Sequence, residues 1–403
     1  MVPHDAKPFV ALGVLPLMVL EQAYEAAVRR RADSVGTIDV LAHLAISDRP
    51  GAQGLLADSR AGLARMVANP HTMPTWRSPG ELGPQPETDF DFEAQAVLRE
   101  VEWRVRRMAG LPGMLGRADV EHWQTRPRWT AGVEATLAGA LTAARQHAVP
   151  FADLIHLLLA MLRLPGCDGT RFVFPYDHVQ MDALEWLSRD PNLRRSGRPH
   201  PSFEASTMVA RQASPTGRLA KWFFTPLIRL SRVAPLLADV RVEARRQAVR
   251  VGHDVIGPAH TLLAMLTVDA TLEAIGVRTT ADHAGLNRGA FILRAVGVTA
   301  DRLREVTTSR GGPEDPPAEV LAEQLGQLRL GDPAEGAEVR SAWHRAGEIS
   351  LACRHRTTGT NHLLLALVED GAGEAASILR ALGLDAATFR ERVRQDPAFT
   401  SAA

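Results

Sequence analysis

Hydrophobic residues recur at spacings of three and four along most of the chain, which predicts amphipathic helices rather than strands. Runs of β-branched residues are scarce, and no tight-turn dipeptide such as Asn-Gly lies between alternating segments. Three stretches rich in proline, glycine and polar residues interrupt the helical pattern, at residues 71–88, 191–218 and 309–317. The sequence therefore predicts an all-α protein whose helical parts are separated by linkers.

Comparison of the chain with itself shows a pattern that occurs four times. Each copy has an anchor residue followed by an apolar helix, and the anchors are Asp39, His156, His260 and His362. Small residues, which let two helices approach closely, lie 16 and 12 positions before every anchor: Ala23 and Ala27, Ala140 and Ala144, Ala244 and Ala248, Ala346 and Ser350. An alanine-rich composition alone would produce some of these matches. The joint agreement of spacing and sequence favours a true repeat.

The last two copies also agree after the anchor helix. Gly297 and Gly383 each follow an apolar helical turn and are predicted to end it. Short amphipathic helices are expected next, at residues 300–307 and 386–394, so that one copy is a four-helix module. Residues 92–108 and 219–237 are predicted to form additional helices outside the repeats.

At these residues the chain resembles the Clp N-terminal repeat family, found in pairs at the amino end of AAA+ unfoldases such as ClpC and ClpA. The family's Gly-His and Ile-Gly-Thr-Glu-His motifs are matched by Gly252-His253, Ile256-Gly257 and His260, and by Gly359-Thr360 and His362. The resemblance implies tandem Clp-N-like domains, each made of two four-helix repeats related by pseudo-twofold symmetry. It covers residues 236–396 closely and the first half by spacing and weaker sequence matches.

The chain departs from the family at the motif glutamate. In ClpC-type domains that residue helps to bind the guanidinium of phosphoarginine; the corresponding residues here are Ile38, Ile155, Ala259 and Asn361. Because an aliphatic side chain cannot replace a carboxylate in recognising a guanidinium, reading of phosphoarginine is not expected. Ligands with more apolar character are favoured instead.

Composition limits the function further. The 403 residues include 46 basic and 46 acidic side chains, so no general attraction to nucleic acid or to an anionic membrane is expected. The lysines are Lys7 and Lys221, and neither follows a glycine, so the sequence contains no phosphate-binding loop of the Walker A type. Arginine and alanine richness indicates a high-GC bacterial genome. We predict a protein that is not an enzyme and binds no cofactor.

The cysteines and the amino-terminal sequence indicate a cytoplasmic location. Cys167 and Cys353 lie far apart in the sequence and predict neither a disulfide framework nor a cysteine zinc site. The most apolar stretch, residues 9–20, is too short to cross a membrane and lacks the features of a signal peptide. No membrane partner is therefore expected.

The motif histidines could be structural or could bind a metal. His253 and His260 are seven residues apart, as are His355 and His362. The structural interpretation is favoured, because buried ring nitrogens ordinarily satisfy nearby backbone groups and the same histidines are structural in the family. We therefore expect no metal site, and we assign a structural role to His156, His253, His260, His355 and His362.

The repeats predict three parts. Residues 1–190 form a degenerate double repeat with a proline-rich insertion near 71–90, residues 191–235 form a linker with an extra helix, and residues 236–397 form a second double repeat. The candidate ligand-binding residues are those of the two motif loops: Gly257, Pro258, Ala259, Gly359, Thr360 and Asn361.

The function expected from the resemblance is a non-catalytic binding module for peptide, protein or small-molecule ligands. It would act as an adaptor or regulator of a Clp unfoldase–protease, or as a decoy for compounds that target the unfoldase's amino-terminal domain, such as cyclic peptides. The alternative is a structural or assembly protein whose groove is filled by its own inserted helices. An enzyme would require convergent polar residues near His122, His147 and Asp153.

Overall fold

The computed structural model describes residues 9–47, 56–69, 73, 78–83, 90–109, 126–199, 235–277, 284–309 and 332–400. Helices account for nearly all of the regular structure in these residues, and the strands among them are two residues long. The predicted all-α class is confirmed. The described residues between 9 and 199 form one compact unit, and those between 235 and 400 form another. We call them the amino-terminal and the carboxy-terminal unit.

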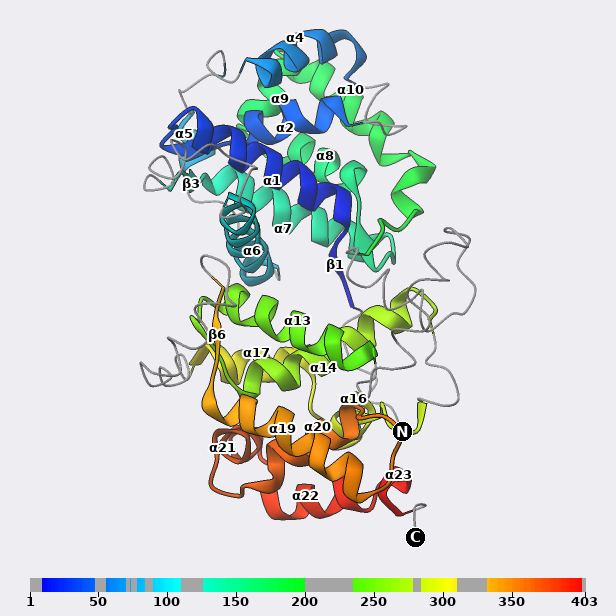
Figure 1. The fold of residues 1–403 in the computed structure, drawn as a ribbon. Helices are drawn as coiled ribbons and strands as arrows, with labels where there is room; N and C mark the ends of the chain where they lie inside the picture. The colour runs from blue at the N-terminus through cyan, green and yellow to red at the C-terminus, as the bar shows by residue number, and fades with distance from the viewer. Residues whose placement is uncertain are drawn as a thin grey trace, which may run out of the picture. The chain divides into compact units, whose positions relative to one another are not determined.

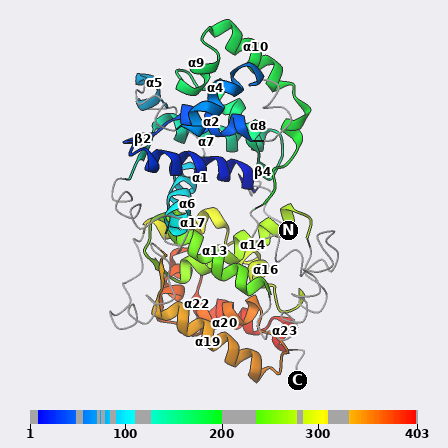
Figure 2. The same cartoon turned by 45° about the horizontal axis from the view of Figure 1, so that its top comes forward.

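The amino-terminal unit is built around four helices that contact one another, α1 (Val14–Arg29), α2 (Thr37–Ile46), α7 (Ala131–Gln146) and α8 (Leu154–Arg163) (Figure 2). The packing of α1 on α2 is repeated by α7 on α8. Shorter elements surround this centre: α4 (Ala57–Ala68), α5 (Pro79–Leu82), α6 (Asp91–Ala109), α9 (Asp168–Val173), α10 (Asp177–Ser188) and the 3-10 helix η3 (Pro191–Arg194).

The carboxy-terminal unit repeats this arrangement with α13 (Pro235–Val251) on α14 (Pro258–Ala274) and α19 (Ala337–Ala352) on α20 (Thr360–Glu369) (Figure 1). Each pair is followed by two shorter helices, and a one-turn helix closes the unit. These elements are α16 (Gly289–Ala295), α17 (Ala300–Ser309), α21 (Glu374–Ala381), α22 (Ala386–Arg394) and α23 (Pro397–Thr400). The predicted helices at 300–307 and 386–394 are confirmed by α17 and α22.

Short parallel strands connect the two helix pairs of each unit. In the amino-terminal unit, β1 (Ala11–Leu12) leads into α1 and pairs with β4 (Phe151–Ala152), which leads into α8. In the opposite sense, β2 (Ser34–Val35) leads into α2 and pairs with β3 (Arg128–Trp129), which leads into α7. The carboxy-terminal unit shows β5 (Val255–Ile256), before α14, paired with β6 (Ala334–Glu335), before α19. Each strand pair joins the start of the first helix of one helix pair to the start of the second helix of the other.

The small residues predicted to allow close helix contact are buried. In each of the four pairs of small residues, both side chains are at most 3% exposed, from Ala23 and Ala27 in α1 to Ala346 and Ser350 in α19. Each unit has a hydrophobic core of its own, one running from Leu17 to Leu193 in sequence and the other from Leu236 to Val393. The small side chains therefore lie in the packed interior, on the helix of each pair that contacts its partner helix.

The turn between the paired helices has the same backbone conformation four times. A left-handed residue lies eight positions before each anchor, and these residues are Arg31, Ala148, Gly252 and Arg354, with φ values of 56°, 55°, 81° and 55°. In each turn the amide of the following residue donates to a carbonyl five positions earlier, which is the Schellman arrangement that ends a helix. Gly297 and Gly383, predicted to end helices, also have positive φ.

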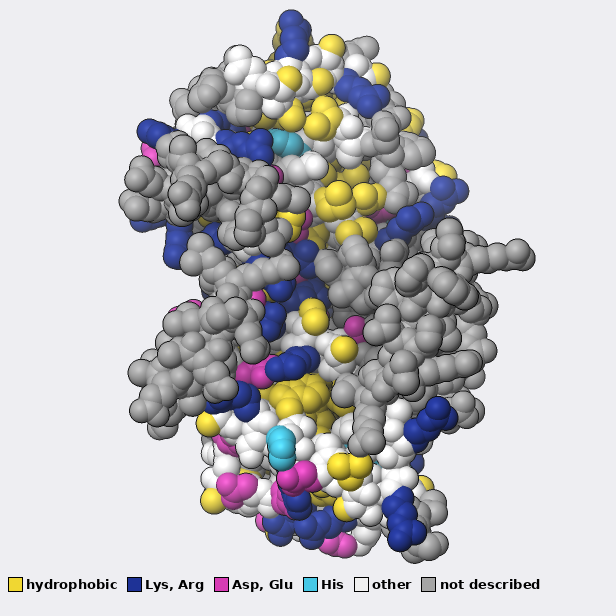
Figure 3. Space-filling model, in the orientation of Figure 1, with side chains coloured by type: hydrophobic (Ala, Val, Ile, Leu, Met, Phe, Trp, Pro, Cys, Tyr) yellow, Lys and Arg dark blue, Asp and Glu magenta, His cyan; other side chains and the backbone are white. Residues whose placement is uncertain are grey.

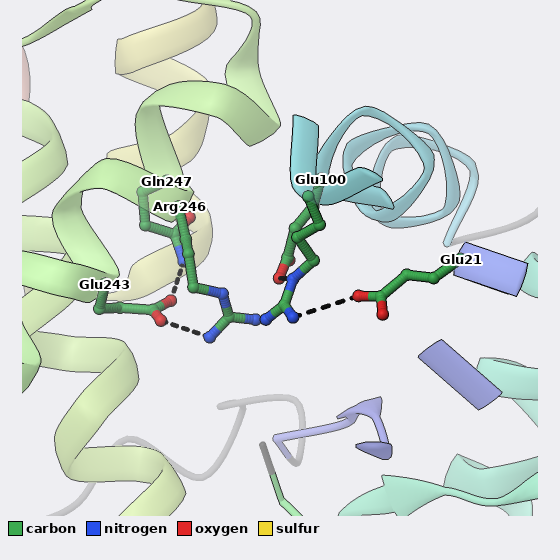
Figure 4. A network of polar contacts seen from close by, with 6 residues as sticks. Glu21, Glu100, Glu243, Arg246 and Gln247 are labelled. Carbon is green, nitrogen blue, oxygen red and sulfur yellow. Dashed lines mark hydrogen bonds and ion pairs between the residues drawn. The ribbon is translucent and has the colours of Figure 1, made fainter. Parts of the chain in front are cut away.

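Helix α6, predicted from residues 92–108, packs on α1 and α7 and adds a helix to the repeat arrangement. Arg104 on α6 forms ion pairs with Glu100 on the same helix, at 2.9 Å, and with Glu21 on α1, at 3.2 Å; both carboxylates are labelled in Figure 4. The other predicted additional helix, at 219–237, lies outside the described residues except for the start of α13. In that helix Glu243 accepts hydrogen bonds from Arg246 and Gln247 (Figure 4).

The described parts of two segments predicted as linkers, residues 78–83 and 191–199, are structured and packed. Residues 191–199 belong to the amino-terminal unit, because Leu193 is buried and the Gly197 amide donates to the Phe151 carbonyl next to β4. The insertion near 71–90 contains α5, whose Glu81 is completely buried. Pro79 and Pro191 begin the short helices of these segments, a position where proline is tolerated because its missing amide hydrogen would have no partner within the helix.

Candidate ligand-binding site

Each anchor residue lies in the first turn of its helix, and its side chain helps to cap that helix. Its side chain accepts the amide hydrogen of the N-cap residue three positions earlier: Asp153 donates to His156 Nδ1 at 3.0 Å, Gly257 to His260 at 2.9 Å and Gly359 to His362 at 2.9 Å. Asp39 makes the same bond through Oδ2, which accepts from the Gly36 amide at 2.7 Å. This is the reciprocal half of a capping box, so aspartate and histidine perform the same local task at the four anchors.

The second polar atom of each anchor has a partner too. Because Nδ1 accepts a hydrogen bond, a neutral anchor histidine carries its hydrogen on Nε2. That hydrogen is donated to His253 Nδ1 at 3.0 Å by His260, to His355 Nδ1 at 2.7 Å by His362 and to the Leu193 carbonyl at 2.9 Å by His156. Asp39 instead accepts from Arg30 at 2.6 Å, in an ion pair whose side chains are 0% and 4% exposed.

The buried histidines are held neutral. Burial, helped by the neighbouring His253, lowers the pKa of His260 to about 3. Burial and the neighbouring His355 lower the pKa of His362 to about 4, and burial also lowers that of His156. A proton on Nδ1 would remove the acceptor on which the helix cap depends. Both ring nitrogens of each anchor histidine therefore form hydrogen bonds within the chain.

The six candidate ligand-binding residues lie in the first turns of α14 and α20 and their N-caps, and all of them are buried. Asn361, 0% exposed, donates to the Gly285 carbonyl and to Asp396, and its Oδ1 accepts from the Arg288 amide. A Cβ on Gly359 would lie 2.2 Å from the carbonyl oxygen of Leu286. The loop at 359–361 therefore binds the segment before α16, within the same unit.

A pocket of about 580 Å³ opens next to this loop. Three segments form it: the chain before α16, the turn between α19 and α20, and the start of α23. The lining residues are Gly285, Leu286, Arg288, Cys353, Arg354, His355, Pro397 and Ala398. None of the six predicted residues lines this pocket, although Asn361 positions two of the three segments that do.

The polar side chains that line the pocket are predominantly hydrogen-bond donors. Arg354 is exposed, and the Arg288 guanidinium, 34% exposed, pairs with Asp396 at 3.2 Å. His355 Nδ1 accepts from His362, so a neutral His355 carries its hydrogen on Nε2. Burial raises the pKa of the Cys353 thiol, which keeps it protonated and unreactive. The pocket thus combines two guanidinium groups and an imidazole N–H donor with the apolar surfaces of Leu286, Pro397 and Ala398.

The amino-terminal unit has an equivalent position. Thr37 and Thr360 both lie two residues before their anchors, and each hydroxyl accepts from a glycine amide at a helix start, Gly169 at 3.0 Å and Gly289 at 3.1 Å. Counted from those glycines, Gly166 corresponds to Leu286 and Asp168 to Arg288. The pocket in one unit can therefore be compared with a defined surface in the other.

The insertion covers that surface in the amino-terminal unit. Ser78 donates to the Gly166 carbonyl at 3.2 Å and, through its amide, to Asp168 at 3.0 Å. The Glu81 carboxylate accepts from the Thr37 amide at 2.6 Å, the Thr37 hydroxyl at 2.8 Å and the Thr130 hydroxyl at 2.6 Å. Segment 78–82 was predicted to be part of a linker. It instead covers the surface beside the first motif loop, and we call it the internal occupant of that surface.

Sequence reasoning missed Glu81 and Arg354 for different reasons. Glu81 is the carboxylate in the short α5, and no periodic pattern surrounds it to predict burial. Arg354 could have been found by alignment of the turns, since it stands where the third copy has Gly252 and a non-glycine residue with positive φ is uncommon. Of the proposed enzyme cluster, Asp153 caps α8, the His147 and His156 rings are 6.3 Å apart, and His122 lies outside the described residues.

Other kinds of site find no support in the part of the chain that the structure describes. No three His, Cys, Asp or Glu side chains there come together as metal ligands would. None of the described helices combines the length and hydrophobicity needed to cross a bilayer. Within each unit, the coloured basic and acidic side chains on the face drawn in Figure 3 lie in small groups.

Comparison with known proteins places part of the chain in a family context. Residues 337–398, from α19 to α23, match the Clp repeat (R) N-terminal domain family. Over 155 residues the chain is 26% identical to a protein from Chlamydia pneumoniae named as a probable ATP-dependent Clp protease ATP-binding subunit. That alignment covers 38% of this chain and 15% of the relative. One Clp repeat is thus identified directly, and it contributes the α19–α20 turn and the α23 residues that line the pocket.

Proposed function

We propose that this chain is a Clp-repeat binding module that captures peptide, protein or small-molecule ligands and catalyses no reaction. The pocket of about 580 Å³ carries the proposal, because two of the three segments that form it lie in residues 337–398, which match the Clp repeat family. Its volume suits a ligand of several residues or a drug-sized molecule. The module would act as an adaptor or regulator of a Clp unfoldase–protease, or as a decoy for compounds that bind the unfoldase.

We also propose that the chain contains four divergent copies of the repeat, arranged as two double repeats. Two recurring features support this: a left-handed residue eight positions before each anchor, and an anchor side chain that accepts the N-cap amide. Neither feature depends on the residue type, since aspartate and histidine both cap and arginine, alanine and glycine all form the turn. The packing of residues 191–199 supports extending the first double repeat from residue 190 to about residue 199.

The test is affinity capture from the host's extract with the tagged full-length protein, analysed by mass spectrometry for proteins and small molecules. Recovery of Clp unfoldase or protease subunits would support an adaptor, and a stoichiometric small molecule or cyclic peptide would support a decoy. An Ala398→Trp variant, which fills the pocket, should lose the ligand. An Ala387→Trp variant, changed at an exposed position of α22 away from the pocket, should retain it.

An assembly role is the second candidate, and the internal occupant of the amino-terminal unit favours it. Segment 78–82 closes the surface beside Thr37 with hydrogen bonds from within the chain, as expected of a unit whose groove is filled by its own insertion. The other proposed occupant, Leu219–Leu237, lies outside the described residues up to residue 234. Capture of nothing except further copies of the chain would overturn the ligand-binding proposal and favour assembly.

A further inference from the structure

We propose that the pocket of the carboxy-terminal unit binds a carboxylate-bearing, extended peptide segment, and that segment 78–82 in the amino-terminal unit shows the occupied form of the equivalent surface. The inference rests on the proposed function, that the carboxy-terminal unit is a ligand-binding module, and it adds the chemical class of the ligand. Donor chemistry in the pocket and the internal occupant support it independently.

The pocket offers cations and donors where a ligand's backbone or side chains would lie. Arg354 is exposed on the turn and has no ion-pair partner among the described residues, whereas Arg288 is already neutralised in part by Asp396. His355 adds an Nε2 hydrogen in its neutral form. A ligand that supplies a carboxylate oxygen satisfies these groups, and guanidinium–carboxylate bonds are stronger than neutral hydrogen bonds. A cationic ligand would be repelled by the same side chains.

The amino-terminal unit shows how a segment lies on the equivalent surface. Ser78 contacts Gly166 and Asp168, the counterparts of Leu286 and Arg288. Glu81 binds the amide and hydroxyl of Thr37, whereas the amide of the counterpart Thr360 already donates to Asn287 Oδ1 at 3.1 Å, so the comparison applies to the place of Ser78. Where Asp168 accepts the Ser78 amide, the carboxy-terminal unit has Arg288. The exchange of an acidic residue for a basic one changes the preferred occupant at this point from a donor to an acceptor. A peptide in the pocket should therefore carry an acidic residue at the place of Ser78.

The experiment uses two fluorescein-labelled peptides based on residues 78–83. The charged peptide is Glu-Pro-Gly-Glu-Leu-Gly, in which the first residue replaces serine, and its neutral match is Gln-Pro-Gly-Gln-Leu-Gly. Fluorescence anisotropy with the full-length protein should show binding of the charged peptide at least about tenfold tighter than the neutral one, as expected when the carboxylate at the place of Ser78 meets the guanidinium groups of the pocket. The difference should shrink as salt is raised.

Variants locate the binding. Arg354→Glu should weaken the charged peptide by at least about fivefold, since an attraction at an exposed site becomes a repulsion. Arg356→Glu makes the same charge change two residues away, at an exposed position that does not line the pocket, and should have little effect. Circular dichroism of both variants confirms that they fold, and Arg354→Gln separates loss of attraction from added repulsion.

Three results would overturn the inference: equal affinity for the two peptides, equal effects of the Arg354 and Arg356 variants, or binding of inorganic phosphate with no binding of the charged peptide. Such a result beside successful capture of a Clp subunit or small molecule would leave the proposed function in place. Failure of the capture experiment together with tight, Arg354-dependent peptide binding would overturn the Clp role and leave the carboxylate site.

Discussion

Replacing Glu81 with alanine is predicted to destabilise the amino-terminal unit by about 2–6 kcal/mol, although this residue lies in a segment with a linker-like sequence. The Glu81 side chain is completely buried and accepts three hydrogen bonds of 2.6–2.8 Å. The hydroxyls of Thr37 and Thr130 can rotate toward other acceptors, whereas the Thr37 amide is fixed by the helix start. An unsatisfied buried amide costs about 1–3 kcal/mol, and loss of the two hydroxyl bonds adds about 1–3 kcal/mol.

The glutamine variant refines the prediction. Glu81→Gln preserves the shape and one acceptor oxygen, so Thr37 and Thr130 can keep their bonds to Oε1, and the loss should be about 1–2 kcal/mol. Glu185→Ala is the control: Glu185 forms an exposed ion pair with Arg189 on α10, and its removal should change stability by less than about 1 kcal/mol.

The assay combines urea denaturation, monitored by tryptophan fluorescence, with hydrogen exchange. The exchange is measured on the proteolytic fragment that contains the Thr37 amide. The alanine variant should lower the unfolding midpoint and speed exchange at Thr37, in the order Ala, Gln, wild type. A loss below about 1 kcal/mol for Glu81→Ala, with exchange at Thr37 unchanged, would refute the reasoning, because it would mean that this carboxylate satisfies no essential donor.

Three further predictions concern the repeat motif. Gly359→Ala should destabilise the carboxy-terminal unit by more than about 2 kcal/mol in thermal unfolding, because its Cβ would meet a backbone oxygen at 2.2 Å, whereas Gly347→Ala, in open space within α19, should stabilise it by about 0.5–1 kcal/mol. His260→Gln keeps an acceptor for the helix cap but removes a group whose pKa is about 3 in the folded state and about 6.5 in the unfolded state. The contribution of this histidine to wild-type stability is complete above pH ~6.5 and falls as the pH drops toward ~3. Urea titrations should show a smaller fall in the variant. Asp39→Ala leaves the buried Arg30 guanidinium without its carboxylate and should cost about 3–5 kcal/mol by urea unfolding.

The results that would contradict these predictions are equally specific. Equal melting temperatures for the two glycine variants would show that the loop at Gly359 is not tightly packed. An unchanged pH dependence in the glutamine variant would mean that His260 is not the group that titrates. A loss for Asp39→Ala no larger than that for an exposed ion pair would show that Arg30 finds another partner.

The helical frame of this protein could be predicted because it follows from local periodicity. The spacing of Ala244 and Ala248 from His260 identified a helix face before any contact was known, and a helix face is set by residues three and four apart. The same logic predicted α6 and the helix stop at Gly383. Such features depend on neighbours in the sequence, and neighbours can be read directly from it.

The candidate site depends on contacts between distant parts of the chain, which the sequence alone does not reveal. Asn361 was expected to face a ligand, but it binds Gly285 and Asp396, residues 76 and 35 positions away. Glu81 reaches Thr37 across 44 residues. Arg354 lines the pocket because the turn before the anchor faces the segment preceding α16, and only the packed unit shows that the two segments meet.

The crossed strand pairs bear on how such a chain can be shortened or extended. In the amino-terminal unit the strands that lead into α1 and α2 pair with the strands that lead into α8 and α7, respectively. One helix pair cut from the unit would expose two unpaired strand edges and half of a hydrophobic core. The smallest piece that can be gained, lost or transplanted as a folded whole is therefore the unit of two helix pairs, and chains assembled from it should grow in steps of two helix pairs.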